Sequence, residues 1–71
     1  MENEYERVRA LFPSAVPCGV WVPLQNGFEG LATSRGAYRL RRPITLAGRR
    51  KWEVFTLTRK GGLRFAFMCD A

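Results

Sequence analysis

The chain has 71 residues, 46% of them hydrophobic, and nine aromatic side chains, which suffice for the modest core of one small domain. No run of about 18 apolar residues is present, which excludes a membrane-spanning helix, and the acidic residues near the start argue against a signal peptide. The net charge of +6 is uneven, because residues 35–64 hold ten basic residues and one acidic residue, a net of +9.

The first predicted element is a short helix over residues 3–12. Asn3 is a favourable N-cap, and Glu6 stands at the spacing of a capping box, with Glu2 and Glu4 also near the positive end of the helix dipole. Pro13 ends the helix because it disfavours helical backbone at the residue before it. The apolar residues repeat with helical spacing and form one face, made of Tyr5, Val8, Leu11 and Phe12.

The next segment predicts an extended connection over residues 13–18 and a strand over residues 19–24. Pro23 cannot donate to a ladder, so this strand is expected at an edge of a sheet. The pair Asn26-Gly27 is a strong turn signal. A short strand over residues 31–34 is expected between Gly30 and Gly36.

The basic segment predicts the remaining strands. Residues 37–42 alternate in the manner of a strand, and Pro43 is expected to interrupt it before a short strand over 44–46 and a turn at Ala47-Gly48. Residues 51–59 have the strongest strand pattern. The pair Gly61-Gly62 then predicts a two-residue hairpin turn into a strand over 63–69.

A two-residue turn at Gly61-Gly62 fixes the register of that hairpin and hence its two faces. We expect the core face to hold Trp52, Val54, Thr56, Thr58, Leu63, Phe65, Phe67 and Cys69. The opposite face then holds Phe55, Leu57, Ala66 and Met68. The same register sets Arg59 directly opposite Arg64, an arrangement that repels unless solvent or an anion such as phosphate separates them.

Together these elements predict an α+β fold: a short N-terminal helix packed on a four- to five-stranded antiparallel sheet or half-open barrel. We expect one domain over residues 1–71, with its basic β-rich part over 19–69, and a monomer. Cys18 and Cys69 are expected to be free thiols in a reducing compartment, which favours a cytoplasmic protein.

The residue types argue against an enzyme. The sequence contains no histidine, and its two cysteines do not have the spacing of a zinc motif. The carboxylates of Glu29 and Glu53 are isolated, so no pair for hydrolysis is indicated. A ribonuclease built around Glu53 beside Arg50 and Lys51 remains the enzymatic alternative. We therefore expect no catalytic residue, no metal and no cofactor.

Nine basic side chains are the candidate nucleic-acid-binding residues. They are Arg39, Arg41, Arg42, Arg49, Arg50, Lys51, Arg59, Lys60 and Arg64. Arginine binds phosphate through paired hydrogen bonds, and Tyr38 and Phe55 add stacking if they are exposed. The alternative is a solvated surface that only improves solubility. The functional prediction requires these charges to lie together on the folded surface.

The run Arg64-Phe65-Ala66-Phe67-Met68 resembles part of the aromatic strand of RNA-recognition motifs. It lacks the glycine that follows the basic residue in that motif. The chain also lacks a second predicted helix and a partner aromatic strand. We therefore interpret this run as a core strand.

In size and composition the chain, without histidine and rich in arginine, resembles small phage proteins that take over host machinery, above all those that bind bacterial RNA polymerase. The resemblance implies regulation of transcription at a nucleoprotein complex in the host cytoplasm. It rests on no motif and assigns no residue. The alternative is an inhibitor of a host defence or nuclease complex, which grips its protein target through the apolar face of the helix or through an edge strand that contains Trp21.

Overall fold

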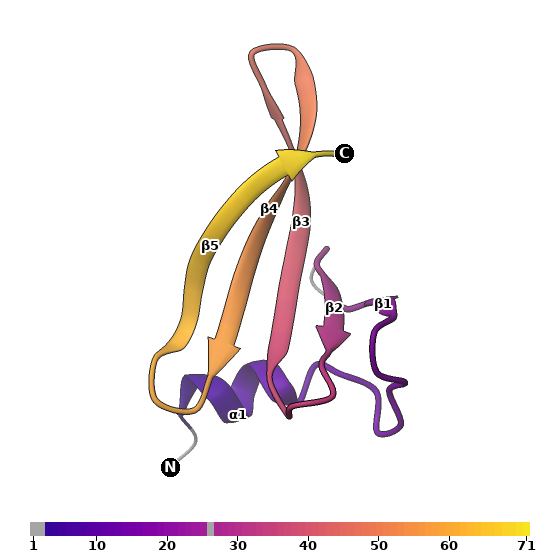
Figure 1. Cartoon of the computed structure of the whole chain (residues 1–71), viewed down its shortest axis with the longest axis vertical. Helices are drawn as coiled ribbons and strands as arrows, with labels where there is room; N and C mark the ends of the chain where they lie inside the picture. The colour runs from indigo at the N-terminus through magenta and orange to yellow at the C-terminus, as the bar shows by residue number, and fades with distance from the viewer. Residues whose placement is uncertain (1–2, 26) are drawn as a thin grey trace.

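The computed structural model describes residues 3–25 and 27–71 (Figure 1). The elements are α1 (Glu4–Arg9), β1 (Trp21–Pro23), β2 (Glu29–Ala32), β3 (Tyr38–Leu46), β4 (Arg49–Thr58) and β5 (Gly62–Asp70). The strands form one open antiparallel sheet in the order β1-β2-β3-β4-β5, which confirms the predicted α+β fold. Glu2 and the predicted turn residue Asn26 lie outside the described residues.

Helix α1 begins as predicted and ends earlier. Asn3 is the N-cap, and its Oδ1 accepts a hydrogen bond from the Glu6 backbone N–H at 2.8 Å. The helix ends at Arg9, three residues before the predicted end, and two tighter turns carry the chain from there to Phe12. The apolar side of this segment faces the sheet, because Phe12 is buried and the rings of Phe12 and Tyr38 lie 4.9 Å apart.

The pairing register places strand side chains on two faces, since neighbours along a strand point in opposite directions. We call the face under α1 the helix face; its strand residues include Tyr38, Leu40, Arg42, Glu53, Phe55, Leu57, Leu63 and Phe65. The core lies on this face, where Leu40 and Leu57 are fully buried against Phe12. No described helix covers the opposite side, the open face, whose strand residues include Trp21, Glu29, Arg39, Arg41, Arg50, Trp52, Val54, Thr56, Arg64 and Phe67.

Phe12 reaches the sheet because β2 carries a glycine at that point. A Cβ on Gly30 would lie 2.5 Å from Cε2 of Phe12, which is well inside van der Waals contact. Gly30 also pairs with Leu40, so the absent side chain lets the ring settle over the centre of the core. Gly30, which the sequence predicts as the boundary of a strand, therefore lies inside β2 at a packing position.

Proline has different effects at its two strand positions. Pro23 ends β1 at the edge of the sheet, as predicted. The expected interruption at Pro43 was wrong, because β3 runs without a break from Tyr38 to Leu46. β2 pairs with β3 only as far as Arg41, so one side of β3 has no neighbouring strand at Pro43 and the missing N–H is tolerated there.

The predicted register of the last hairpin was also wrong. Thr58 pairs with Gly62 and Thr56 pairs with Arg64, so the connection has three residues, 59–61, and Arg59 does not face Arg64. Gly62 supplies the positive φ of 66° that closes such a loop, and the Thr58 hydroxyl accepts a hydrogen bond from the Gly61 N–H at 2.9 Å. The expected repulsion between two opposed arginines therefore does not arise.

A bulge between Val54 and Phe55 changes the faces of the hairpin. Phe55 pairs with Phe65 while Val54 pairs with Phe67, so Ala66 is the extra residue. Phe65 thus lies on the helix face and Phe67 on the open face, with exposed fractions of 54% and 45%. The prediction that this run is a core strand was wrong.

The predicted core face of the hairpin was wrong as well. Of that set only Val54 is buried, and Leu57, assigned to the other face, is fully buried. The half-buried members of that set include Trp52, Thr56 and Leu63, and its exposed members include Thr58 and Cys69. The bulge explains the mixture, because no single register applies to the whole hairpin.

Three further observations concern the part of the chain that the structure describes. Cys18 and Cys69 are both free and exposed. No helix there has the length and apolarity to cross a membrane. Within the same residues, no three His, Cys, Asp or Glu side chains gather in a metal-binding group.

Candidate nucleic-acid interface

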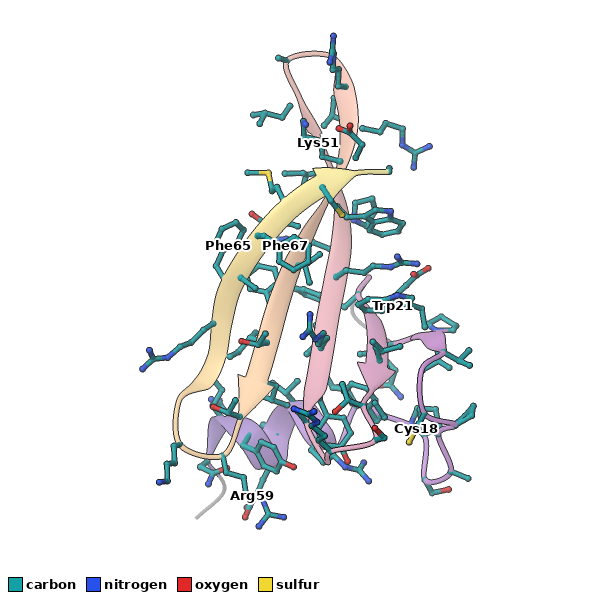
Figure 2. The ribbon with its side chains drawn as sticks, in the orientation of Figure 1. Cys18, Trp21, Lys51, Arg59, Phe65 and Phe67 are labelled. Atoms are coloured by element: carbon teal, nitrogen blue, oxygen red, sulfur yellow. The ribbon has the colours of Figure 1, made fainter. Side chains whose placement is uncertain are left out.

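The nine predicted basic residues are spread along the sheet. Arg50 and Arg59 are nine residues apart on one extended strand and its turn, a separation of about 30 Å, in a molecule whose longest extent is 40 Å. Figure 2 shows Lys51 toward the β3–β4 hairpin and Arg59 at the opposite end of the sheet. The expectation that all these charges lie together was therefore wrong, and the set divides by position and by partner.

Three of the nine cations have an acidic partner directly across a strand pair. Arg41 pairs with Glu29 at 2.7 Å, Lys51 pairs with Asp70 at 3.0 Å, and Arg42 pairs with Glu53. The other six make no ion pair with a described residue; they are Arg39, Arg49, Arg50, Arg59, Lys60 and Arg64. Among the nine, only the latter group offers charge that an external anion can neutralise without replacing an ion pair between described residues.

The unpaired strand arginines favour the open face. Its described strand residues include four arginines, Arg39, Arg41, Arg50 and Arg64, against Glu29, a net of +3. The corresponding charges of the helix face are Arg42, Arg49 and Lys51 against Glu53 and Asp70, a net of +1. Arg39 and Arg64 lie in one row across Thr56, whereas Arg50 lies six residues farther along β4, so the charge of the open face is spread along the sheet.

Arg41 organises the centre of the open face. Its guanidinium carbon lies 4.2 Å from the ring centroid of Trp21 and 4.1 Å from that of Trp52, within cation–π range of both rings. Its Nε also donates to Glu29 at 2.8 Å. These contacts connect all of the strands from β1 to β4. Arg41 therefore positions two indole rings and is not a free phosphate ligand.

The aromatic side chains of the open face lie among its arginines. Trp21 and Trp52 are half-buried beside Arg41, and Phe67 is exposed next to the buried Val54. An exposed ring on a sheet, such as Phe67, can stack on a base of a single strand, whereas Arg41 covers one face of each indole. Trp52 and Phe67 were not predicted as surface residues, because the expected hairpin register placed both on the core face.

The two aromatic residues expected to stack on a ligand are used in packing instead. Tyr38 lies on the helix face against Phe12, and Phe55 forms edge contacts with Phe28 at 6.0 Å and Phe65 at 5.8 Å. The helical face proposed for protein binding is used in the same way: Tyr5 and Val8 pack against the core around Phe12, and Leu11 is half-buried. That face is therefore not free for a partner.

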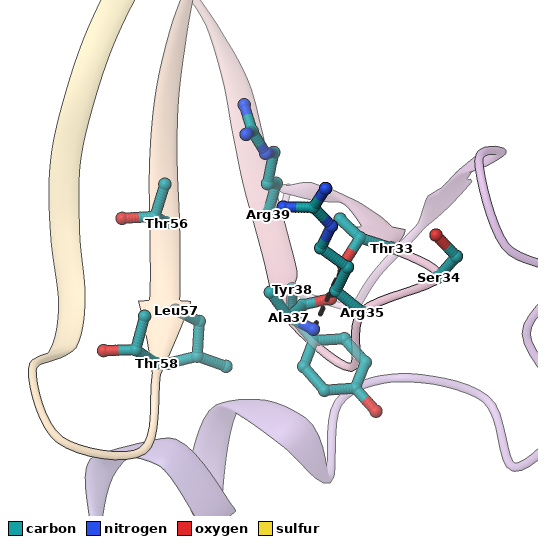
Figure 3. Close-up of a pocket in the computed structure, with 9 residues that line it drawn as sticks. All are labelled: Thr33, Ser34, Arg35, Ala37, Tyr38, Arg39, Thr56, Leu57 and Thr58. Atoms are coloured by element: carbon teal, nitrogen blue, oxygen red, sulfur yellow. Dashed lines mark hydrogen bonds between the residues drawn. The ribbon is translucent and has the colours of Figure 1, made fainter.

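A hollow of about 480 Å³ lies where the β2–β3 turn meets β3 and β4 (Figure 3). Its lining consists of Thr33, Ser34, Arg35, Ala37, Tyr38, Arg39, Thr56, Leu57 and Thr58. Figure 3 shows the side chains of Arg35 and Arg39 extending in the same direction along β3. Arg35 was absent from the predicted set, although its place in a polar turn just before Gly36 is a signal that could have found it.

The geometry thus contains a basic, partly aromatic sheet face that ends in a hollow with two arginines. No protein-family model, curated protein or solved structure matches the chain. The function is therefore inferred from the side chains of this chain alone.

Proposed function

We propose that the chain is a nucleic-acid-binding protein that holds a single strand on the open face of its sheet. The observation that carries the proposal is the net charge of +3 on a face that no described helix covers, with Trp21, Trp52 and Phe67 among the arginines. Opposite charge supplies affinity for the phosphates, and the exposed Phe67 together with the uncovered parts of the two indoles supplies stacking surface for bases.

A single strand fits this face better than a duplex. The bases of a single strand are free to turn toward Phe67 and the indole rings, whereas those of a duplex are stacked on one another. Since every base has a face that can stack, binding of this kind tolerates many sequences. Arg39, Arg50 and Arg64 have no described acidic partner, so each can neutralise one phosphate.

Within this proposal the protein regulates a machine that handles nucleic acid, as the resemblance to small phage proteins implies. A bacterial RNA polymerase is the target we propose, because it exposes single-stranded nucleic acid beside protein. The two sides of the sheet support a bipartite contact of this kind. The open face takes the strand, and the exposed Phe65 and Met68 on the other side contact the polymerase.

The test is the binding of labelled single strands of about 12 nucleotides, DNA and RNA, measured by fluorescence anisotropy with a matched duplex. With three phosphates neutralised, the logarithm of affinity is expected to fall with the logarithm of salt concentration at a slope of about −2, or about 20-fold between 50 and 200 mM salt. The duplex is expected to bind more weakly than the single strand under the same conditions.

Two arginine variants decide whether the open face is responsible. Arg39→Gln removes one unpaired charge from that face and is expected to reduce the salt slope by about 0.7. Arg7→Gln removes the same charge from the exposed side of α1 and serves as the matched control. Failure of every strand to bind at 50 mM salt, or an equal loss of slope in both variants, contradicts the proposal.

The second candidate function is inhibition of a protein through the β5 edge. β5 has no strand on its outer side, and Phe65, Phe67 and Met68 are all exposed on it. The ligand in this case is an extended segment of the target protein that adds a strand to the sheet. A complex that survives both nuclease and high salt, and that Met68→Asp disrupts, favours this function over strand binding.

A further inference from the structure

We infer that the hollow between the β2–β3 turn and the end of β4 binds a phosphate group. The inference rests on the proposed function and assigns one ligand group to a specific part of the site. The hollow adjoins the open face, because Arg39 and Thr56 belong to both.

Two arginines supply the charge of this hollow. Neither Arg35 nor Arg39 forms an ion pair with a described acid, and both side chains are exposed. A guanidinium group presents parallel N–H donors that match two oxygens of a phosphate. An adjacent hollow of about 390 Å³ shares Arg35 and Thr58 and adds Arg59, a third arginine without a described acidic partner.

Hydroxyl groups supply further donors. The Thr58 hydroxyl accepts its hydrogen bond from Gly61, so its own proton is free to be donated. The hydroxyls of Ser34 and Thr56 make no hydrogen bond with another described residue. Two arginines and several hydroxyl-bearing residues therefore line a hollow whose lining includes no acidic side chain. A lining with two guanidinium groups and no acidic side chain suits an anion with several acceptor oxygens.

The arginine turn is held in place before any ligand binds. The Thr33 backbone N–H donates to the Ala37 carbonyl at 2.9 Å, and the Thr33 hydroxyl bonds both the N–H and the carbonyl of Ala37 at 3.1 Å. Gly36 takes the positive φ of 79° that closes the turn. Because the turn is already ordered, little backbone freedom is lost when Arg35 engages an anion.

The hollow is large enough for a phosphate that is part of a larger molecule. A volume of about 480 Å³ exceeds that of a phosphate and leaves room for an attached sugar. Arg39 and Arg41 are two residues apart on β3, about 7 Å, so a strand that starts in the hollow continues directly onto the aromatic centre of the open face. The phosphate belongs either to the end of a strand or to its backbone.

The first experiment titrates the ¹⁵N-labelled protein with inorganic phosphate and follows its backbone amides by NMR at constant ionic strength. We expect saturable shifts confined to residues 33–39 and 56–58. Arg35→Gln is expected to weaken this binding at least 5-fold, and Thr56→Val to weaken it less, whereas the matched control Arg49→Gln leaves it unchanged. Shifts spread over the whole chain, or shifts insensitive to Arg35→Gln, overturn the inference.

The second experiment compares single strands with a 5′-phosphate, a 3′-phosphate or no terminal phosphate. If one phosphorylated strand binds more tightly than the unphosphorylated strand, and Arg35→Gln abolishes this difference, the ligand is a terminal phosphate. If all three strands bind with equal affinity, and Arg35→Gln weakens all three equally, the ligand is a backbone phosphate. Strand binding that Arg35→Gln does not change overturns the inference and leaves the proposed function standing. Phosphate binding in the hollow without binding of any strand rejects the proposed function alone.

Discussion

The two faces of this sheet place the same residue types in different surroundings. On the helix face, aromatic rings pack against one another, as Phe12 does on Tyr38, and Arg42 is matched by Glu53. On the open face, two indole rings pack against the guanidinium of Arg41, and further arginines have no described acidic partner. A chain of 71 residues has few apolar side chains with which to cover both sides of a sheet, so most of the core lies on one face and no described helix covers the other.

The largest expected effect comes from the helix face. Leu57→Ala removes a side chain with no exposed surface from the core, and a change of this kind costs about 2–5 kcal/mol of unfolding free energy. In a domain this small such a loss leaves little stability, and we expect denaturant unfolding at a much lower midpoint. Leu46→Ala, at an exposed position near the end of the same sheet, is the control and is expected to change the midpoint little. Equal losses in the two variants contradict the assignment of the core.

The next effect separates the faces on a single strand. Phe67→Ala on the open face is expected to weaken single-strand binding by about 1–3 kcal/mol through loss of one stacking surface. Phe65→Ala, two residues earlier and on the helix face, is a matched control because it removes the same ring at similar exposure. Anisotropy titrations compare the two. If Phe65→Ala loses affinity and Phe67→Ala does not, the nucleic acid binds the helix face and not the open face, which contradicts the proposed function.

This contrast between two phenylalanines was beyond prediction from the sequence. Local signals predicted the N-cap Asn3 and the edge position of Pro23 correctly, because each depends on the chemistry of one residue. Residues 63–69 are apolar at nearly every position, so alternation could not decide which of them face the core. The pair Gly61-Gly62 is compatible with more than one turn frame, and the frame sets the register.

The prediction that the basic side chains lie together failed for the same reason, because it also depends on the strand register. The three ion pairs found among the described residues all join direct partners across two strands, so they become visible only once the register is known. The sequence identified the basic segment and its arginines. It could not show that Arg41 lies between two rings or that Arg35 and Arg39, from a turn and a strand, border one hollow.

A smaller effect is expected from the two neighbouring arginines that point to opposite faces. The side chain of Arg41 is 24% exposed and lies about 4 Å from two indole centroids, whereas Arg42 is 49% exposed and lies nearly 6 Å from Phe28 and Phe55. Arg41→Ala is therefore expected to cost about 1–2 kcal/mol of stability, and Arg42→Ala less. Denaturant unfolding followed by tryptophan fluorescence measures both. A greater loss for Arg42→Ala means that the two rings do not stabilise the open face as we infer.

The smallest effect tests whether the faces act independently. Asn3→Ala removes the cap that holds the Glu6 N–H and is expected to cost about 1 kcal/mol, because the first turn of α1 loses a hydrogen-bond partner. Ser14→Ala, in the exposed connection after the helix, is the control. Since α1 covers only the helix face, the affinity for a single strand should not change while the domain stays folded. Affinity is measured well below the unfolding temperature, where the variant is folded. If Asn3→Ala lowers the affinity under these conditions, α1 helps to shape the open face, and the two faces of the sheet are not independent.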